Sequence, residues 1–130
     1  MRPTTPILVA DDEHAIRDLL RAALERRGYV VLTANDGEEA LVVLDTVRPA
    51  LLILDVQMPR LDGWGVMQEL RFRRLDIPVI VMSALPNIAH RAAELGAARH
   101  LPKPFRIVEL IRAVEELVPP PRESVTEGVA

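Results

Sequence analysis

Short apolar runs alternate with longer segments of helical period along most of this chain. The runs Leu51–Leu54 and Ile77–Met82 contain no polar residue, which is typical of strands covered on both faces of a sheet. Further strands are expected at Ile7–Ala10, at Tyr29–Thr33 and around Arg99–Leu101. The chain therefore predicts five short strands, each followed by a segment long enough to form a helix.

The segments between these runs repeat apolar residues at three- and four-residue spacing, as one face of a helix does. In the first segment the repeating positions are Ile16, Leu19, Leu20, Ala23 and Leu24. In the third segment they are Val66, Met67, Leu70 and Phe72. Parallel strands joined by helical crossovers require this alternation. We expect an α/β fold, a flavodoxin-like doubly wound (βα)5 three-layer sandwich whose parallel sheet has the order 2-1-3-4-5.

Polar residues follow four of the expected strands at the point where each strand ends. Asp11 and Asp12 follow the first strand, and Asp55 follows the third. Ser83 follows the fourth strand, and Lys103 follows the fifth. The carboxyl ends of parallel strands meet at one edge of the sheet, where open α/β folds bind their ligands. We therefore expect three carboxylates, a hydroxyl and an ammonium group to gather there.

Carboxylates gathered at one edge repel one another, so a divalent cation is expected among them. Oxygen ligands without histidine favour Mg²⁺, with Mn²⁺ as an alternative, over zinc. An aspartate can also attack a phosphoryl group and hold it as an acyl phosphate. Asp55 ends the central strand of the expected sheet, and Lys103 and Ser83 are then placed to bind phosphoryl oxygens.

Each of these residues, taken singly, also fits an ordinary structural role. Asp11 and Asp12 fit the start of a helix, where acidic side chains cap the backbone and complement the helix dipole. Asp55 fits a turn after a strand, and Lys103 fits a solvated surface. Their joint occurrence at four strand ends favours a functional site.

Bulk composition excludes several classes of protein. The chain has 130 residues, a net charge of −3 and no cysteine, so disulfides and thiolate chemistry are absent. No apolar run approaches the ~20 residues of a membrane span, and no signal-peptide core precedes the first strand. We expect a cytoplasmic protein that binds neither nucleic acid nor membrane directly. Residues 1–118 are expected to form one domain, followed by a Pro-rich tail or linker stub at 119–130.

Several motifs, taken in order, resemble the receiver domain of two-component response regulators. They are Val9-Ala10-Asp11-Asp12-Glu13, Leu54-Asp55-Val56-Gln57-Met58-Pro59 with Asp62-Gly63, Met82-Ser83-Ala84, Gly96-Ala97 and Lys103-Pro104-Phe105. The resemblance extends from about Ile7 to Leu117. Each motif is weak alone, whereas all of them in this order and at this spacing are specific.

The resemblance implies that a sensor histidine kinase or a phosphotransfer protein donates a phosphoryl group to Asp55. It implies that Asp12, Asp55 and the backbone carbonyl of Gln57 ligate Mg²⁺, and that Asp11 acts mainly through water. Such a domain is not an enzyme toward other molecules. It catalyses phosphotransfer to its own aspartate and the later loss of that phosphate.

The resemblance also assigns the residues that report phosphorylation. Ser83 and Ala84 are expected to bind the phosphoryl group together with Lys103. A cis peptide between Lys103 and Pro104 is implied as well. Phosphorylation then biases a two-state surface and changes its affinity for a downstream protein. The resemblance does not name that target, and it leaves a monomer and a weak homodimer both open.

Two features depart from the family pattern. His100 occupies the switch position on the fifth strand, where relatives carry Tyr or Phe. It predicts either a weakened switch or a coupling that depends on pH, because imidazole titrates near neutral pH. The stretch from Ser83 to Lys103 is also slightly shorter than usual, so the helix expected at Ile88–Leu95 should be short, displaced or mobile.

Two other functions stay open from the sequence. A pseudo-receiver would use the same fold as a constitutive interaction module, and the departure at His100 leaves room for it. A Mg²⁺-dependent phosphohydrolase resembling the haloacid dehalogenase family would use an aspartyl nucleophile within Asp-x-Asp. Here Asp55-Val56-Gln57 lacks the second acid, so the phosphorylatable receiver is the leading hypothesis.

Overall fold

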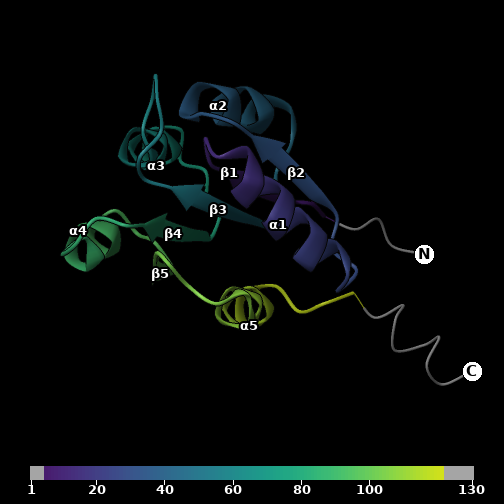
Figure 1. Cartoon of the computed structure of the whole chain (residues 1–130). Helices are drawn as coiled ribbons and strands as arrows, with labels where there is room; N and C mark the ends of the chain where they lie inside the picture. The colour runs from purple at the N-terminus through teal and green to yellow at the C-terminus, as the bar shows by residue number, and fades with distance from the viewer. Residues whose placement is uncertain (1–4, 122–130) are drawn as a thin grey trace, which may run out of the picture.

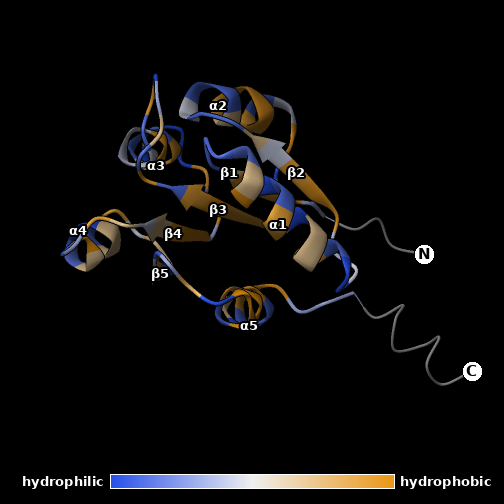
Figure 2. Cartoon of the chain, viewed as in Figure 1, coloured by the Kyte–Doolittle hydropathy of each residue, from blue (hydrophilic) through white to orange (hydrophobic). Residues whose placement is uncertain are grey.

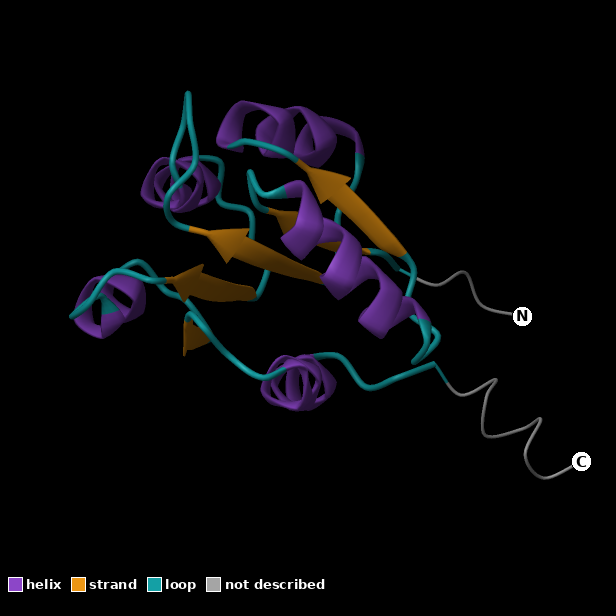
Figure 3. Ribbon diagram, viewed as in Figure 1, coloured by secondary structure: helices purple, strands orange, loops and turns teal. Residues whose placement is uncertain are grey.

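The computed structural model describes residues 5–121, in which five strands and five helices alternate along the chain (Figure 1, Figure 3). In chain order the elements are β1 (Ile7–Ala10), α1 (His14–Glu25), β2 (Val31–Ala34), α2 (Gly37–Thr46), β3 (Leu51–Asp55), α3 (Gly63–Phe72), β4 (Val79–Ser83), α4 (Ala89–Glu94), β5 (Arg99–Pro102) and α5 (Ile107–Leu117). Each predicted strand and helix is therefore present.

The strands form one parallel sheet in the order β2-β1-β3-β4-β5. Every neighbouring pair of strands is parallel, so each connection between them is a crossover through a helix. The register places Asp55 beside Met82 and Ser83 beside Pro102, which aligns the carboxyl ends of β3, β4 and β5. The predicted flavodoxin-like topology is confirmed.

Helices cover both faces of this sheet and give the molecule three layers (Figure 1). Buried residues of α1 and α5 pack on one face, and buried residues of α2, α3 and α4 pack on the other. β3 and β4 are buried along their whole length, as their unbroken apolar runs predict. In Figure 2 the helices carry hydrophobic and hydrophilic residues on different sides, as amphipathic helices over a core do.

Two apolar residues that helical spacing assigns to buried faces point into solvent instead. Leu19 is 53% exposed, and Phe72 is 83% exposed. On α1 the fully buried positions are Leu20 and Leu24. Consecutive helical residues differ by about 100° around the axis, so Leu19 falls at the margin of the buried stripe. For these two residues the predicted burial is wrong, because spacing alone does not set the width of a packed stripe.

Two strands begin later than the apolar pattern predicts. β2 begins at Val31 because the backbone N–H of Tyr29 donates to the Leu24 carbonyl and so belongs to the end of α1. β4 begins at Val79 because Pro78 has no backbone N–H to join the ladder. The end of α1 thus delays the start of β2, and the missing N–H of Pro78 delays the start of β4.

α4 has six residues and is the shortest helix in the described part of the chain, as the shortened segment predicts. Ala92 anchors it in the core. The Arg91 guanidinium lies over the Trp64 ring, 4.7 Å from the ring centroid. Arg71 Nη1 of α3 donates to the Glu94 carbonyl of α4 at 3.0 Å. Two arginine side chains therefore join α4 to α3.

The chain leaves α5 beside the corner between α1 and β2. The Tyr29 hydroxyl donates to the Val118 carbonyl, and a Cβ built on Gly28 would lie 3.4 Å from the Pro121 ring. Of the predicted tail at 119–130, residues 122–130 lie outside the described residues. Within the described part, no helix has the length and apolar character needed to cross a membrane.

Arg91→Ala removes the cation that covers Trp64. Trp64 is the one tryptophan of the sequence and is 7% exposed, so its fluorescence reports the contact between α3 and α4. We expect acrylamide to quench this fluorescence more strongly in the variant, and the free energy of unfolding to fall by about 0.5 to 1 kcal/mol. Arg112→Ala, at an exposed position of α5, is the matched control. Equal quenching in the parent and both variants would contradict the contact.

Candidate functional site

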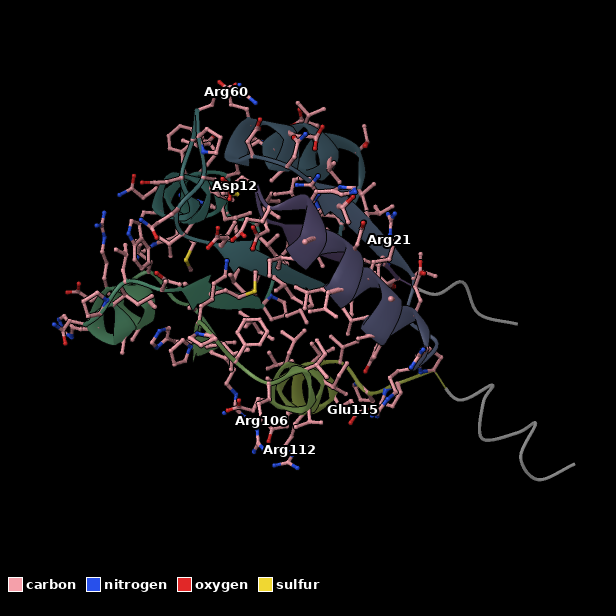
Figure 4. The ribbon with its side chains drawn as sticks, viewed as in Figure 1. Asp12, Arg21, Arg60, Arg106, Arg112 and Glu115 are labelled. Atoms are coloured by element: carbon pink, nitrogen blue, oxygen red, sulfur yellow. The ribbon has the colours of Figure 1, made fainter. Side chains whose placement is uncertain are left out.

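The carboxyl ends of β1, β3 and β5 bring predicted acidic and basic side chains to one edge of the sheet. Asp12 is labelled in Figure 4 near the start of α1, at this edge. One carboxylate oxygen from each of Asp11, Asp12 and Asp55 lies within 4.8 Å of the other two. The Lys103 ammonium reaches two of these acids from the β5 side. The strand ends thus gather three negative charges around one positive charge.

Asp11 is fully buried, and each of its polar atoms has a partner. Its backbone N–H donates to the Ala34 carbonyl at 3.1 Å, and its own carbonyl accepts from Arg17 Nη1 at 2.8 Å. Its Oδ1 accepts from the Glu13 N–H at 2.9 Å, and its Oδ2 accepts from Lys103 Nζ at 3.0 Å. Asp11 is therefore fixed in place as an anchor of the site.

Asp55 ends β3 and is only 4% exposed. Burial, and after it the negative charge of Asp11, raises the pKa of Asp55 from 3.8 to about 6, although Lys103 opposes the rise. Ionised Asp55 therefore carries a free-energy cost that a nearby cation would offset. The side chain of Asp12, unlike those of Asp11 and Asp55, is exposed, so its carboxylate lies on the solvent side of the cluster.

Lys103 lies between two acids, with a side chain that is 16% exposed. Its Nζ lies 3.0 Å from Asp11 Oδ2 and 3.3 Å from Asp55 Oδ1. Burial lowers the pKa of Lys103, but the hydrogen bond to Asp11 and the charges of Asp55 and Asp11 outweigh burial, so the pKa is raised overall. The ammonium group therefore stays charged at neutral pH.

Ser83 is buried at the end of β4, where its hydroxyl accepts from the Leu85 N–H at 2.9 Å. A hydroxyl that accepts one hydrogen bond keeps its own proton for another acceptor. The Ser83 carbonyl accepts from the Lys103 N–H at 2.8 Å, which joins the ends of β4 and β5. Ala84 is exposed beside Ser83, and the Lys103–Pro104 peptide is cis.

Gln57 lies in the loop after β3, where its side chain is exposed. This loop folds back on the strand, since the Gly63 N–H donates to the Val56 carbonyl at 2.8 Å. A Cβ on Gly63 would lie 2.4 Å from the Asp55 carbonyl oxygen, so the contact requires glycine. The sequence motif contains Gly63 but does not show that it packs against the backbone of Asp55.

His100 lies on β5 beside Val81 of β4. The next residue, Leu101, packs in the cluster formed with α1 and α5, so strand alternation directs His100 to the opposite face of the sheet. Its Nε2 is buried and has no hydrogen-bond partner among the described residues. Buried polar atoms are nearly always hydrogen-bonded, so an unpaired nitrogen at this position is unusual.

The donor atoms of the cluster suit a hard divalent cation. The group consists of carboxylates alone, without His or Cys. Mg²⁺ is usually held by one or two carboxylates and keeps several waters, which fits a cluster with one exposed acid and two buried ones. Burial first, and the charge of Asp11 second, raise the pKa of Asp55, and the positive charge of a bound cation would oppose both effects.

The family model for the response regulator receiver domain matches residues 7–115. Over 114 residues the chain is 48% identical to the probable transcriptional regulator ycf27 of Cyanophora paradoxa, covering 86% of this chain and 47% of that protein. Over 114 residues it is 45% identical to the response regulator MprA of Mycobacterium ulcerans, covering 86% and 49%. The chain thus spans about half the length of the curated relatives it matches.

Solved structures agree with this match. The receiver domain of the Francisella response regulator 1452 superposes with a TM-score of 0.83 and 34% identity, covering 88% of this chain and 96% of that one. The response regulator TrrA of Thermotoga maritima, in complex with Mg²⁺ and BeF, has a TM-score of 0.80 and 35% identity, covering 88% and 100%. The chain belongs to the response regulator receiver domain family of two-component systems.

Proposed function

We propose that this receiver, residues 1–118, is switched by phosphorylation, and that Asp55 accepts the phosphoryl group in a Mg²⁺-dependent reaction. The observation that carries the proposal is the 3.3 Å contact between Lys103 Nζ and Asp55 Oδ1 inside a cluster of three acids. The acids provide ligands for a cation, and the ammonium provides a positive charge for the phosphoryl oxygens.

Asp12, Asp55 and the backbone carbonyl of Gln57 would hold the metal ion, Mg²⁺ or alternatively Mn²⁺. Asp11 would contribute through water, because its two carboxylate oxygens already accept from Glu13 and Lys103. The bound ion supplies positive charge that neutralises phosphoryl oxygens. Burial supports the different roles of Asp11 and Asp12, since the carboxylate of Asp12 is exposed whereas that of Asp11 is buried and hydrogen-bonded.

The phosphoryl donor would be the phosphohistidine of a sensor histidine kinase or of a phosphotransfer protein. A carboxylate oxygen of Asp55 bonds to phosphorus while the P–N bond breaks, and the imidazole leaves with the electron pair and gains a proton. Lys103 and the Ser83 hydroxyl donate to phosphoryl oxygens, and Ala84 belongs to the same phosphate-binding turn. Attack by water later releases inorganic phosphate and restores the carboxylate.

The output would be a change in affinity for a downstream protein, with no direct contact to nucleic acid or membrane by this domain. We propose a cytoplasmic location and a monomer or weak homodimer. The relatives support a signalling role, because they include a response regulator and a probable transcriptional regulator. Residues 119–130 would then be a tail or a linker.

A constitutive pseudo-receiver is the second candidate. Two features favour it, the Nε2 of His100 that has no partner among residues 5–121 and the six-residue α4, because both lie in the part of the fold that would report phosphorylation. The aspartyl phosphohydrolase has no such support, since Gln57 stands where that enzyme class needs an acid.

Incubation with Mg²⁺ and acetyl phosphate separates these candidates. We expect an acid-stable, base-labile adduct at Asp55 by mass spectrometry, and none in Asp55→Asn. Asp45→Asn, which changes an acid that is 58% exposed on α2, should form the adduct normally. No adduct with any donor, including a cognate kinase, would support the pseudo-receiver, and rapid turnover of phosphate esters would support the phosphohydrolase.

Asp55→Asn also tests, through pH, the cost of holding a charged carboxylate in a buried position beside Asp11. The pKa of Asp55 is about 6 in the folded chain against an ordinary 3.8, so within this window the folded chain keeps a proton that the unfolded chain has lost. The stability of the parent therefore falls as pH rises through the window and stays low above it. With a discount for screening, we expect the variant to be more stable above the window by about 1 to 2 kcal/mol in Mg²⁺-free buffer.

Urea unfolding of both proteins across this pH range checks the expectation. The advantage of the variant should shrink as the pH falls toward 3.8, the ordinary value for the carboxyl. Mg²⁺ should stabilise the parent more than the variant, because the parent alone offers the Asp55 carboxylate. Parallel pH profiles for parent and variant would show that Asp55 is not destabilised by its surroundings.

His100→Phe removes the buried Nε2 that lacks a partner in the described part of the chain. Because an unsatisfied buried polar atom is costly, we expect the free energy of unfolding to rise by about 1 kcal/mol. His90→Phe, at a side chain that is 87% exposed, should leave it unchanged. A loss of stability in His100→Phe would mean that the imidazole is accommodated by its surroundings.

The same variant tests whether His100 couples pH to the switch. If it does, the partner affinity of phosphorylated protein depends on pH in the parent and not in His100→Phe.

A further inference from the structure

The backbone carbonyl of Asp11 depends on a side chain for its hydrogen bond. β2 ends at Ala34, whose carbonyl accepts from the Asp11 N–H, and the sheet does not continue past this pair. Arg17, one turn into α1, reaches back and donates from Nη1 to the Asp11 carbonyl at 2.8 Å. A guanidinium group thus takes the place of the next strand residue at the point where β1 turns into the site.

The same guanidinium is held from its other side. Arg17 Nη2 lies 3.3 Å from His14 Nδ1, and His14 Nε2 lies 3.0 Å from Asp18 Oδ2. Arginine can only donate, so any hydrogen bond in this contact runs from Arg17 Nη2 to His14 Nδ1. The first turns of α1 therefore hold the guanidinium in the orientation that meets the Asp11 carbonyl.

We propose that Arg17 is a positioning residue for the metal-binding acids. The carbonyl that it holds belongs to the peptide joining Asp11 to Asp12. The contact therefore fixes the backbone from which the exposed Asp12 side chain extends. Asp11 is already fixed by Glu13 and Lys103, whereas the Asp12 side chain is exposed and makes no hydrogen bond or ion pair seen among the described residues. This inference rests on the proposed role of Asp12 in holding Mg²⁺, and it adds a residue outside the acid cluster to that role.

A positioning role and simple electrostatics predict opposite effects of removing Arg17 on cation affinity, which makes the inference testable. Arg17 carries a positive charge next to the acids, so removing that charge should strengthen the binding of a cation. If removal of Arg17 weakens cation binding, the loss must come from positioning. Outer-shell partners of metal ligands typically change metal affinity by tenfold or more.

Arg21 provides a matched control on the same helix. It lies one turn further along α1 and also donates to a backbone carbonyl, from Nη2 to Val31 at 3.4 Å. Figure 4 labels Arg21 beside α1, away from Asp12. Arg21→Met therefore removes the same charge and a similar contact without touching the Asp11 peptide.

The experiment is a titration of the intact protein with Mg²⁺ by calorimetry and with Mn²⁺ by the electron paramagnetic resonance of the free ion. We expect Arg17→Met to bind either ion about tenfold more weakly than the parent. Arg21→Met should bind like the parent, and Arg17→Lys should lie closer to the parent than Arg17→Met does. Arg17→Gln replaces Arg17→Met if urea unfolding shows that the methionine variant does not fold.

Phosphorylation by acetyl phosphate adds a second readout. The Mg²⁺ concentration for half-maximal rate should rise in Arg17→Met, while the rate at saturating Mg²⁺ stays that of the parent. Binding of Mg²⁺ by Arg17→Met that is equal to or tighter than in the parent would overturn the proposal, as would equal weakening in Arg21→Met. If the parent binds Mg²⁺ but forms no adduct, the proposed phosphotransfer fails while the titration still tests Arg17.

Discussion

Two buried carboxylates share one ammonium group at the strand-end edge, and the site is organised around this shortage of positive charge. Lys103 Nζ lies 3.0 Å from Asp11 Oδ2 and 3.3 Å from Asp55 Oδ1. Asp12 adds a third carboxylate at the exposed side, so the cluster keeps an excess of negative charge. Burial and the charge of Asp11 therefore raise the pKa of Asp55. A divalent cation would supply the missing charge, which links metal binding to the reactive state of Asp55.

The surrounding fold holds these repelling groups together. β3 and β4 are buried along their whole length, so the strand that ends in Asp55 cannot move without opening the core. Gly63 lets the next loop pack on the backbone of Asp55, and Arg17 holds the carbonyl of Asp11. The side that would report phosphorylation, formed by α4 and β5, is held by fewer contacts. There α4 has six residues and is joined to α3 by two arginine contacts, and His100 buries a nitrogen that finds no partner in the described part of the chain.

The fold and the residues of the acid cluster could be predicted from the sequence, because unbroken apolar runs mark buried strands and parallel strands place their ends at one edge. The exposure of Leu19 and Phe72 could not, since the width of a buried stripe depends on what the helix packs against. The contact of Arg17 with the Asp11 carbonyl and the packing of Gly63 on the Asp55 backbone could not be predicted either. In both cases the position of the partner atom is set only when the chain is folded. Spacing identifies which residues approach one another, and it does not identify the hydrogen bonds that hold them.

A crystal structure of the protein with Mg²⁺ and beryllium fluoride tests the assignment of Asp55 most directly. Beryllium fluoride mimics a phosphoryl group on a carboxylate oxygen, so we expect it bonded to Asp55, with Lys103 and Ser83 donating to fluorine atoms. The metal ion should lie between Asp12 and Asp55, next to the Gln57 carbonyl. An unmodified Asp55 at saturating ligand, or a metal ion outside the cluster of Asp11, Asp12 and Asp55, would contradict a phosphoacceptor role for this site.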